Sequence, residues 1–161
     1  NLISVLDGGL KKWKVENRKT SNNTNKISKS DYRGNELFKL VKDKKTIDEN
    51  IKKQEFVVVD ARSRGRFEGK IPDPRKNVKS GSIPNSVCLP FVELINEDHS
   101  FKNLNELNQL FQVFLKNHNN NLVFSCGSGV TACVLALAYS LVNTKYLPVI
   151  YDGSWTEYGK I

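Results

Sequence analysis

The sequence lacks the features that define several large classes of protein. No apolar run reaches the roughly 18 residues that a membrane-spanning helix needs, and the longest apolar stretch, residues 130–142, is interrupted by two hydroxyl residues. Its three cysteines, Cys88, Cys126 and Cys133, form no CxxC pair and no Cys/His cluster. An odd cysteine count without regular spacing argues against a disulfide-stapled secreted domain, and the pattern offers no zinc site. We therefore expect a reducing compartment, no membrane insertion and no bound metal.

Two kinds of cysteine chemistry are also excluded by missing residues. Histidine occurs only at His99 and His118, both in polar stretches, so nothing in the sequence supports a cysteine protease. A cysteine phosphatase needs an arginine at the sixth position after its nucleophile, because that arginine clamps phosphate with two hydrogen bonds. The sixth residue after Cys126 is Ala132. If Cys126 is a nucleophile, sulfur transfer is the chemistry that remains.

The composition is that of a globular domain with an excess of positive charge. Hydrophobic residues make up 39% and charged residues 26% of 161 residues, and the net charge is +8. This length suffices for one domain with its own core. A positive surface attracts anions, whether a small acid, a nucleic acid or a membrane. The basic residues are not interleaved with aromatic residues into a base-stacking surface, so a nucleic-acid partner is not expected.

Strand and helix patterns alternate along the chain. Short β-branched runs that read as buried strands are followed by segments in which apolar residues recur three and four apart. This alternation predicts an α/β fold with three layers and a central, mostly parallel, five-stranded sheet flanked by helices. The predicted strands are residues 5–6, 56–59, 87–89, 122–124 and 149–151, and the predicted helices are residues 10–14, 46–53, 104–115 and 130–142.

A short internal echo indicates a tandem duplication. Leu6-Asp7-Gly8-Gly9 resembles Tyr151-Asp152-Gly153-Ser154; each follows a short apolar strand and is followed by a tryptophan. We interpret residues 1–20 as the tail of a preceding domain with its linker, residues 21–30 as a polar linker, and residues 31–161 as a second domain. The chain starts without a visible signal peptide, and we expect it to be a fragment whose localisation, cytoplasmic or mitochondrial, the sequence does not decide.

The segment that carries chemistry is the loop after the predicted strand 122–124. Cys126 ends the strand, Gly127 and Gly129 follow, and a helix begins at Val130. Glycines allow the backbone to fold into a bowl with its N–H groups pointing inward, and the helix N-terminus adds partial positive charge. Both effects favour a thiolate at Cys126. The alternative, that Cys126 is a buried small hydrophobe, stays open on this pattern alone.

The loop Cys126-Gly127-Ser128-Gly129-Val130-Thr131 resembles the active-site loop of the mercaptopyruvate sulfurtransferases, which belong to the rhodanese superfamily. The related thiosulfate sulfurtransferases carry arginine and lysine where this chain has Gly127 and Ser128. The resemblance implies a rhodanese-like fold, a persulfide on Cys126, and no cofactor. It also implies that the backbone of Gly127, Gly129, Val130 and Thr131 cradles the sulfur, and that Ser128 assists in passing a proton.

The resemblance extends beyond the loop, from Val5 to Tyr158. Asp60 and Arg62 match a strand-end Asp-x-Arg and are expected to brace the loops. Arg66 and Arg75 match the two arginines that hold the carboxylate and keto oxygen of mercaptopyruvate. The segment 151–158 matches a C-terminal signature, in which Trp155 is expected to pack on the sheet. Ser82 departs from the pattern, since the family commonly has histidine at this position.

These matches imply an activity and its partners. Sulfur would pass from 3-mercaptopyruvate through Cys126 to thioredoxin, another thiol or cyanide. In the family, an N-terminal rhodanese-like domain contributes an acidic residue and a histidine, and this partner is missing from the chain. Three alternatives remain: a thiosulfate sulfurtransferase, a non-catalytic interaction module, and a sulfur carrier for cofactor or tRNA thiolation. The other two cysteines, Cys88 and Cys133, are expected in the core.

Overall fold

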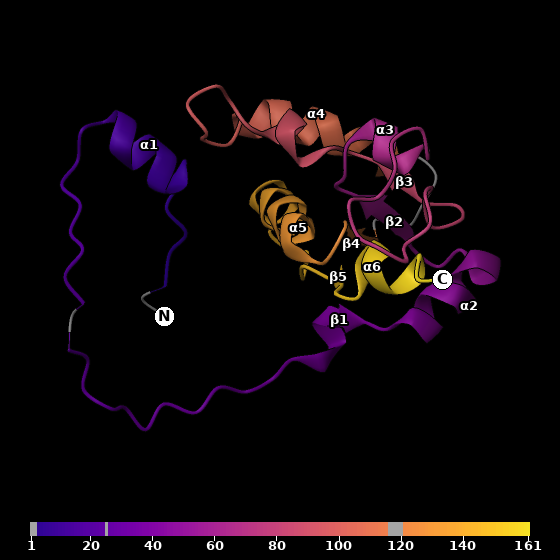
Figure 1. The fold of residues 1–161 in the computed structure, drawn as a ribbon, viewed down its shortest axis with the longest axis horizontal. Helices are drawn as coiled ribbons and strands as arrows, with labels where there is room; N and C mark the ends of the chain where they lie inside the picture. The colour runs from indigo at the N-terminus through magenta and orange to yellow at the C-terminus, as the bar shows by residue number, and fades with distance from the viewer. Residues whose placement is uncertain (1–2, 25, 116–120) are drawn as a thin grey trace.

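Five parallel strands form one sheet between two layers of helices in the computed structural model, which describes residues 3–24, 26–115 and 121–161 (Figure 1). The strand order is β1-β5-β4-β2-β3, and every pair is parallel. This confirms the predicted α/β class. The strands are β1 (Val41–Lys42), β2 (Val57–Asp60), β3 (Val87–Cys88), β4 (Leu122–Ser125) and β5 (Ile150–Tyr151).

The alternation of side chains along the two central strands creates a core on each side of the sheet. Val57 and Val59 of β2 lie in the cluster packed against α4 and α5, whereas Val58 lies in the cluster that contains Trp155. Trp155 is 1% exposed, which confirms that it packs on the sheet. The covering helices are α2 (Lys44–Lys53), α4 (Leu104–Leu115), α5 (Val130–Val142) and α6 (Ser154–Tyr158).

The register of β2 and β4 positions the candidate site. Asp60 pairs with Ser125, and the Ala61 amide donates to the Ser125 carbonyl at 2.8 Å. Both strands therefore end at the same level, so Cys126 and the segment after Asp60 emerge at the same edge of the sheet. The carboxyl edge of a parallel sheet is where open α/β folds place their ligands.

One of the predicted elements needs correction, and several observed elements were not predicted. The strand predicted at residues 5–6 does not form: Val5 and Leu6 are exposed and have no β partner among the described residues. A strand of two residues forms only when its backbone bonds to a neighbouring strand, and no neighbouring strand lies beside residues 5–6 in the part of the chain that the structure describes. Conversely, the pattern gave no sign of β1, which pairs with β5 and is too short to show periodicity. The short elements also absent from the prediction are η1 (Phe38–Leu40), α3 (Arg64–Phe67), η2 (Phe91–Leu94) and α6 (Ser154–Tyr158).

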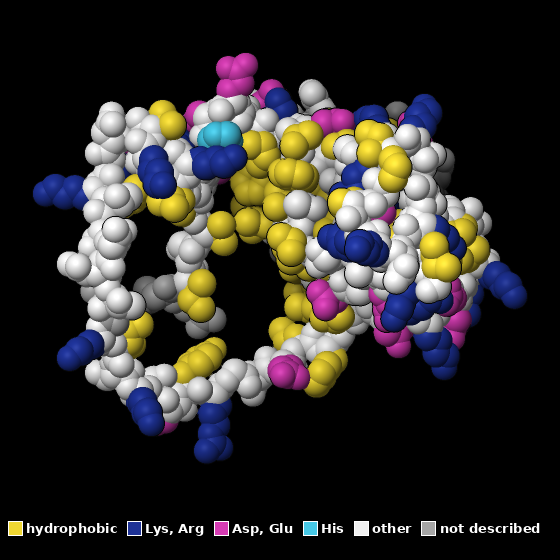
Figure 2. All heavy atoms as spheres, viewed as in Figure 1, with side chains coloured by type: hydrophobic (Ala, Val, Ile, Leu, Met, Phe, Trp, Pro, Cys, Tyr) yellow, Lys and Arg dark blue, Asp and Glu magenta, His cyan; other side chains and the backbone are white. Residues whose placement is uncertain are grey.

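The N-terminal segment lies beside the sheet-bearing body. Its helix α1 (Gly9–Val15) buries none of its residues, and Lys12 of this helix forms an ion pair of 2.7 Å with Asp98 of the body. Hydrophobic side chains gather over α5 on the face towards this segment (Figure 2). A hollow of about 700 Å³ lies there, lined among others by Ile3, Val5, Phe101, Leu104, Leu137 and Leu141.

Between α1 and η1 the described residues are exposed and have no regular secondary structure. The polar linker predicted from the composition, residues 21–30, falls within this stretch. The division of the chain at residues 20 and 30 stays a prediction. Across the three described ranges, no helix has the length and apolar character that a bilayer crossing requires.

Candidate active site

The loop between β4 and α5 closes tightly around the Cys126 sulfur. Gly129 caps α5 in the left-handed region, with φ of 79°. A Cβ on Gly129 would lie 2.7 Å from Asp152 Oδ1 and 3.0 Å from the Asp152 carbonyl oxygen. Both the backbone angle and the close approach to Asp152 therefore require glycine at this position.

Cys126 is only 2% exposed, yet its surroundings favour the thiolate. Burial by itself would raise the pKa of Cys126, but hydrogen bonds to the sulfur outweigh it and lower the pKa below the ordinary thiol value. The donors are the Thr131 hydroxyl and the backbone N–H groups of Ser128, Ala132 and Thr131. Of the residues predicted to cradle the sulfur, Thr131 is among these donors, and Ala132 is a donor that the prediction did not name. The Gly129 amide does not contribute, because it donates to Ser154 Oγ at 3.1 Å.

Two arginines lie across the loop from Cys126, held by one buried carboxylate. Asp73 has a side chain 1% exposed and accepts from Arg66 at 2.6 Å and from the Arg75 guanidinium at 3.3 Å. Burial would raise the pKa of Asp73, but its hydrogen bonds to Arg66 and Arg75 lower the pKa overall. The group of three therefore carries one net positive charge. Its excess charge suits a ligand with a single carboxylate.

The arginines reach the nucleophile loop directly. Arg75 Nη2 donates to Ser128 Oγ at 3.2 Å. A Cβ on Gly127 would lie 3.0 Å from Arg75 Nη1 and 3.4 Å from Arg66 Nη2. Only glycine at position 127 lets both guanidinium groups approach the loop this closely without displacement.

A cleft of about 320 Å³ brings most of the predicted residues together. Gly129 lies on the other side of the loop, against Asp152. Ser63 and Phe91 line the cleft without having been singled out from the sequence. The lining residues are Ala61, Arg62, Ser63, Arg66, Arg75, Phe91, Cys126, Gly127, Ser128, Val130 and Thr131.

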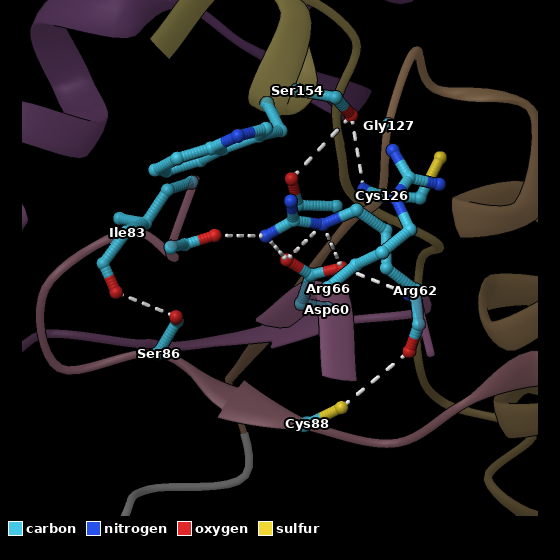
Figure 3. A network of polar contacts seen from close by, with 12 residues as sticks. Asp60, Arg62, Arg66, Ile83, Ser86, Cys88, Cys126, Gly127 and Ser154 are labelled. Atoms are coloured by element: carbon cyan, nitrogen blue, oxygen red, sulfur yellow. Dashed lines mark hydrogen bonds and ion pairs between the residues drawn. The ribbon is translucent and has the colours of Figure 1, made fainter. Parts of the chain in front are cut away.

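Asp60 and Arg62 form a buried ion pair beside the cleft. Both side chains are 2% exposed, and Arg62 binds both carboxylate oxygens of Asp60 (Figure 3). Arg62 also donates to the Gly81 carbonyl at 2.8 Å, and its guanidinium lies 4.7 Å from the centre of the Trp155 ring. The pair therefore links the end of β2 to the loop before β3. This geometry suits the bracing role expected for both residues, and that role remains a proposal.

The other two cysteines differ from the expectation. Cys133 is exposed, so its placement in the core was wrong. Helix α5 is apolar on nearly all faces, so the sequence gave no periodicity from which to identify the buried side. Cys88 is half-buried, and burial raises its pKa to about 11. As expected, His99 is exposed, whereas His118 lies outside the described residues.

Sequence reasoning missed two residues that organise the site. Asp73 was visible only as part of Pro72-Asp73-Pro74-Arg75, and its position between the two arginines was the one available signal. Ser154 is fully buried and binds two amides of the loop from 25 and 28 residues away. No sequence spacing announces such a contact. Within the described ranges, no group of three or more histidine, cysteine or acidic side chains is arranged to hold a metal ion.

Comparisons with known proteins agree with this architecture. The family of rhodanese-like domains matches residues 43–160. The chain is 37% identical over 156 residues to 3-mercaptopyruvate sulfurtransferase of Homo sapiens, covering 97% of this chain and 52% of that protein. Thiosulfate sulfurtransferase of Rattus norvegicus is 33% identical over 157 residues, with the same coverage. The sub-stoichiometric sulfur transferase subunit of yeast mitochondrial complex I is 34% identical, with a TM-score of 0.71 over 84% of this chain and 48% of that one.

The chain spans about half the length of the curated relatives that it matches. Their similarity nevertheless extends over almost all of the chain, and the family match includes β2, the nucleophile loop and the α6 segment. A parallel sheet that ends in a cysteine within a bowl of amides, together with these matches, shows that the chain belongs to the rhodanese family.

Proposed function

We propose that this domain transfers sulfur from 3-mercaptopyruvate, through a persulfide on Cys126, to a thiol acceptor or to cyanide. The observation that carries the proposal is the Cys126 sulfur itself. It is buried at the end of a strand and opens into a cleft lined by two arginines, and three loop amides with the Thr131 hydroxyl lower the pKa of its thiol. Such a site stabilises sulfur anions before and after transfer.

The arginine pair supports a keto acid as the donor. Arg66 and Arg75 offer several N–H donors in planar arrays, which match the geometry of a carboxylate and an adjacent keto oxygen. Asp73 fixes both guanidinium groups and cancels one of their charges. A donor with one carboxylate then enters the cleft without leaving a second anionic charge unpaired.

The transfer step follows from this placement. The Cys126 thiolate attacks the sulfur of 3-mercaptopyruvate, a new S–S bond forms, and the bond between that sulfur and carbon breaks. The electron pair of the broken bond goes to the carbon and gives the enolate of pyruvate, which takes up a proton and leaves. The outer sulfur of the persulfide then passes to an acceptor thiolate, and Cys126 returns to its thiolate form.

Ser128 is the residue of this chain that we propose to assist the protonation. Its hydroxyl oxygen accepts from Arg75, so its own proton is directed elsewhere, and the side chain is exposed at the mouth of the loop. A relay from Ser128 needs an acidic residue or histidine beyond it. We propose that a preceding rhodanese-like domain supplies that residue.

Thiosulfate is the alternative donor, since thiosulfate sulfurtransferases are similar to the chain at nearly the same identity. Two observations favour mercaptopyruvate. Gly127 and Ser128 place no cation beside the sulfur, whereas a dianion is stabilised by cations at this position. In addition, a Cβ at position 127 would lie 3.0 Å from Arg75 Nη1 and 3.4 Å from Arg66 Nη2, so both guanidinium groups would have to shift slightly.

Mass spectrometry of the intact domain tests the proposal. After incubation with 3-mercaptopyruvate, we expect a gain of one sulfur atom on Cys126, and a slower gain from thiosulfate at equal concentration. A Cys126→Ser variant serves as the control and should gain none. Faster loading from thiosulfate than from 3-mercaptopyruvate would show that thiosulfate is the preferred donor and contradict the proposal. No loading from either donor, in this domain and in a longer chain that includes the preceding domain, would favour a non-catalytic interaction module.

A further inference from the structure

Ser154, the first residue of α6, lies behind the nucleophile loop on the side away from the cleft. Its hydroxyl oxygen accepts from the Cys126 amide and from the Gly129 amide, each at 3.1 Å, and donates to the Tyr151 carbonyl at 2.8 Å. Figure 3 shows the contact between Ser154 and Cys126. One buried oxygen thus ties together the two ends of the loop.

The next two residues of α6 complete this support. The Trp155 amide donates to the Cys126 carbonyl at 3.0 Å, and the Thr156 amide donates to the Gly127 carbonyl at 2.9 Å. In a trans peptide the C=O and the following N–H point in opposite directions. Because the Gly127 carbonyl points out towards Thr156, the Ser128 N–H points in towards the sulfur, where it is one of the three amide donors. The start of α6 therefore sets the direction of loop peptides that face the nucleophile.

The backbone conformation of Ser154 is strained for a residue that has a side chain. Its φ is 50°, in the left-handed region that residues with a Cβ rarely adopt. The echo near the N-terminus has Gly9 at the corresponding place, and Gly9 has φ of 55°. Glycine satisfies this turn without strain, so the turn itself does not explain a serine at position 154. What the serine adds is the hydroxyl group that binds the loop.

We propose that Ser154 is a positioning residue for sulfur transfer: by binding the Cys126 and Gly129 amides with one buried hydroxyl, it holds the loop in the form whose remaining amides face the Cys126 sulfur. The inference rests on the proposed function, because the group to be held is the thiolate that becomes the persulfide. Ser154 is not among the residues that line the cleft.

Two variants separate the hydroxyl from the backbone turn. Ser154→Ala removes the hydroxyl and keeps the left-handed strain, whereas Ser154→Gly removes the hydroxyl and relieves the strain. In both variants, the pH at which Cys126 alkylation by iodoacetamide is half-maximal should rise by about one unit, because amides that stabilise the thiolate are no longer aligned. The limiting rate at high pH should stay unchanged. The Ser86→Ala variant is the matched control, since Ser86 also donates to a backbone carbonyl, that of Ile83, away from the loop.

Sulfur loading from 3-mercaptopyruvate gives the second readout. We expect kcat to fall roughly tenfold in both variants while KM changes little, because the arginine pair is untouched. General loosening of the fold would instead increase the alkylation of half-buried Cys88 at every pH. The inference is overturned if Ser154→Gly keeps the wild-type alkylation profile, or if only Ser154→Ala is impaired. Alkylation needs no sulfur donor, so failure of the proposed function, seen as no loading in the wild type, is distinguishable from failure of this inference.

Discussion

At the scale of residues, the site contains few charged groups, and hydrogen bonds fix the positions of those that it has. Asp73 uses a single carboxylate to orient two guanidinium groups, and those groups face a cysteine whose thiolate is stabilised by neutral donors. The charges proposed to bind the substrate and the donors to Cys126 are thus distinct sets, which Arg75 joins by donating to Ser128 Oγ. A change to one set should alter substrate binding with little effect on the nucleophile.

The Arg66→Lys variant tests that separation. Lysine keeps the charge but loses the planar set of donors that engages a carboxylate and Asp73 together. We expect KM for 3-mercaptopyruvate to rise roughly 10- to 100-fold, which corresponds to the ~1.5–3 kcal/mol of hydrogen bonds to a charged group. The value of kcat should change less, and steady-state kinetics with cyanide as the acceptor gives both constants.

Arg64→Lys is the matched control for this variant. Arg64 lies two residues away on the same short helix, but its exposed side chain pairs with Glu93. Its replacement should leave both kinetic constants near the wild-type values. A KM for Arg66→Lys that stays as close to the wild-type value as that of Arg64→Lys would show that positive charge alone, and not the placed guanidinium of Arg66, attracts the substrate.

At the scale of elements, one strand, one loop and two helices form the surroundings of Cys126. β4 delivers Cys126 to the edge of the sheet, α5 starts where the loop ends, and α6 supports the loop from behind. The start of α5 lies close to the segment before α6 at Gly129, because a Cβ built there would meet the backbone of Asp152.

The Gly129→Ala variant should therefore damage both the fold and the activity. A Cβ would meet the Asp152 carbonyl at 3.0 Å, and its φ of 79° is strained for alanine. We expect the free energy of unfolding to fall by about 2 kcal/mol or more, with a marked loss of sulfur loading. Urea denaturation measures the first effect and mass spectrometry the second.

Gly9→Ala is the corresponding control in the echo. Gly9 has a similar left-handed φ of 55°, but no atom lies within 4 Å of a Cβ built there. Its replacement should cost less than about 1 kcal/mol. Equal losses of stability in both variants would mean that the backbone angle, and not the contact with Asp152, makes glycine necessary at position 129.

At the scale of the whole molecule, a sheet-bearing body is joined to an N-terminal segment that contributes little to its core. Helix α1 buries no residue, and the described residues between α1 and η1 are exposed. The segment that matches the family begins only at residue 43. The hollow between the segment and α4–α5 is lined by apolar side chains from both.

Limited trypsin digestion should cut this chain first at Lys19, Lys26, Lys29 or Arg33, which are all exposed outside regular structure. A chain of residues 34–161 should then keep its melting temperature within about 5 °C of the longer one, since few buried contacts are lost. It should also keep the sulfur loading of Cys126. Collapse of the fold on removing residues 1–33 would show that the segment is part of the domain, contrary to the predicted boundary.

The sequence by itself determined the fold class and the local surroundings of Cys126. Continuous apolar runs such as residues 57–59 and 122–124 need burial on both faces of a sheet, which two layers of helices provide. A cysteine at a strand end, followed by Gly127 and Gly129, specifies its own local surroundings. These signals are local, because they depend on spacing within a few residues. Short or partnered elements such as β1 carry no such signal, and the same is true of the exposed face of α5 at Cys133.

Only the tertiary structure decided which distant groups meet. Asp73 joins two arginines and α6 brings Ser154 against the loop from 28 residues beyond Cys126, because the strand order places β5 beside β4 and directs α6 behind it. Such contacts arise when packing closes the chain on itself, and no periodicity records them. The residue types needed for the proposed sulfur chemistry can therefore be identified from the sequence, whereas the relative positions of their side chains depend on how the sheet and its helices pack.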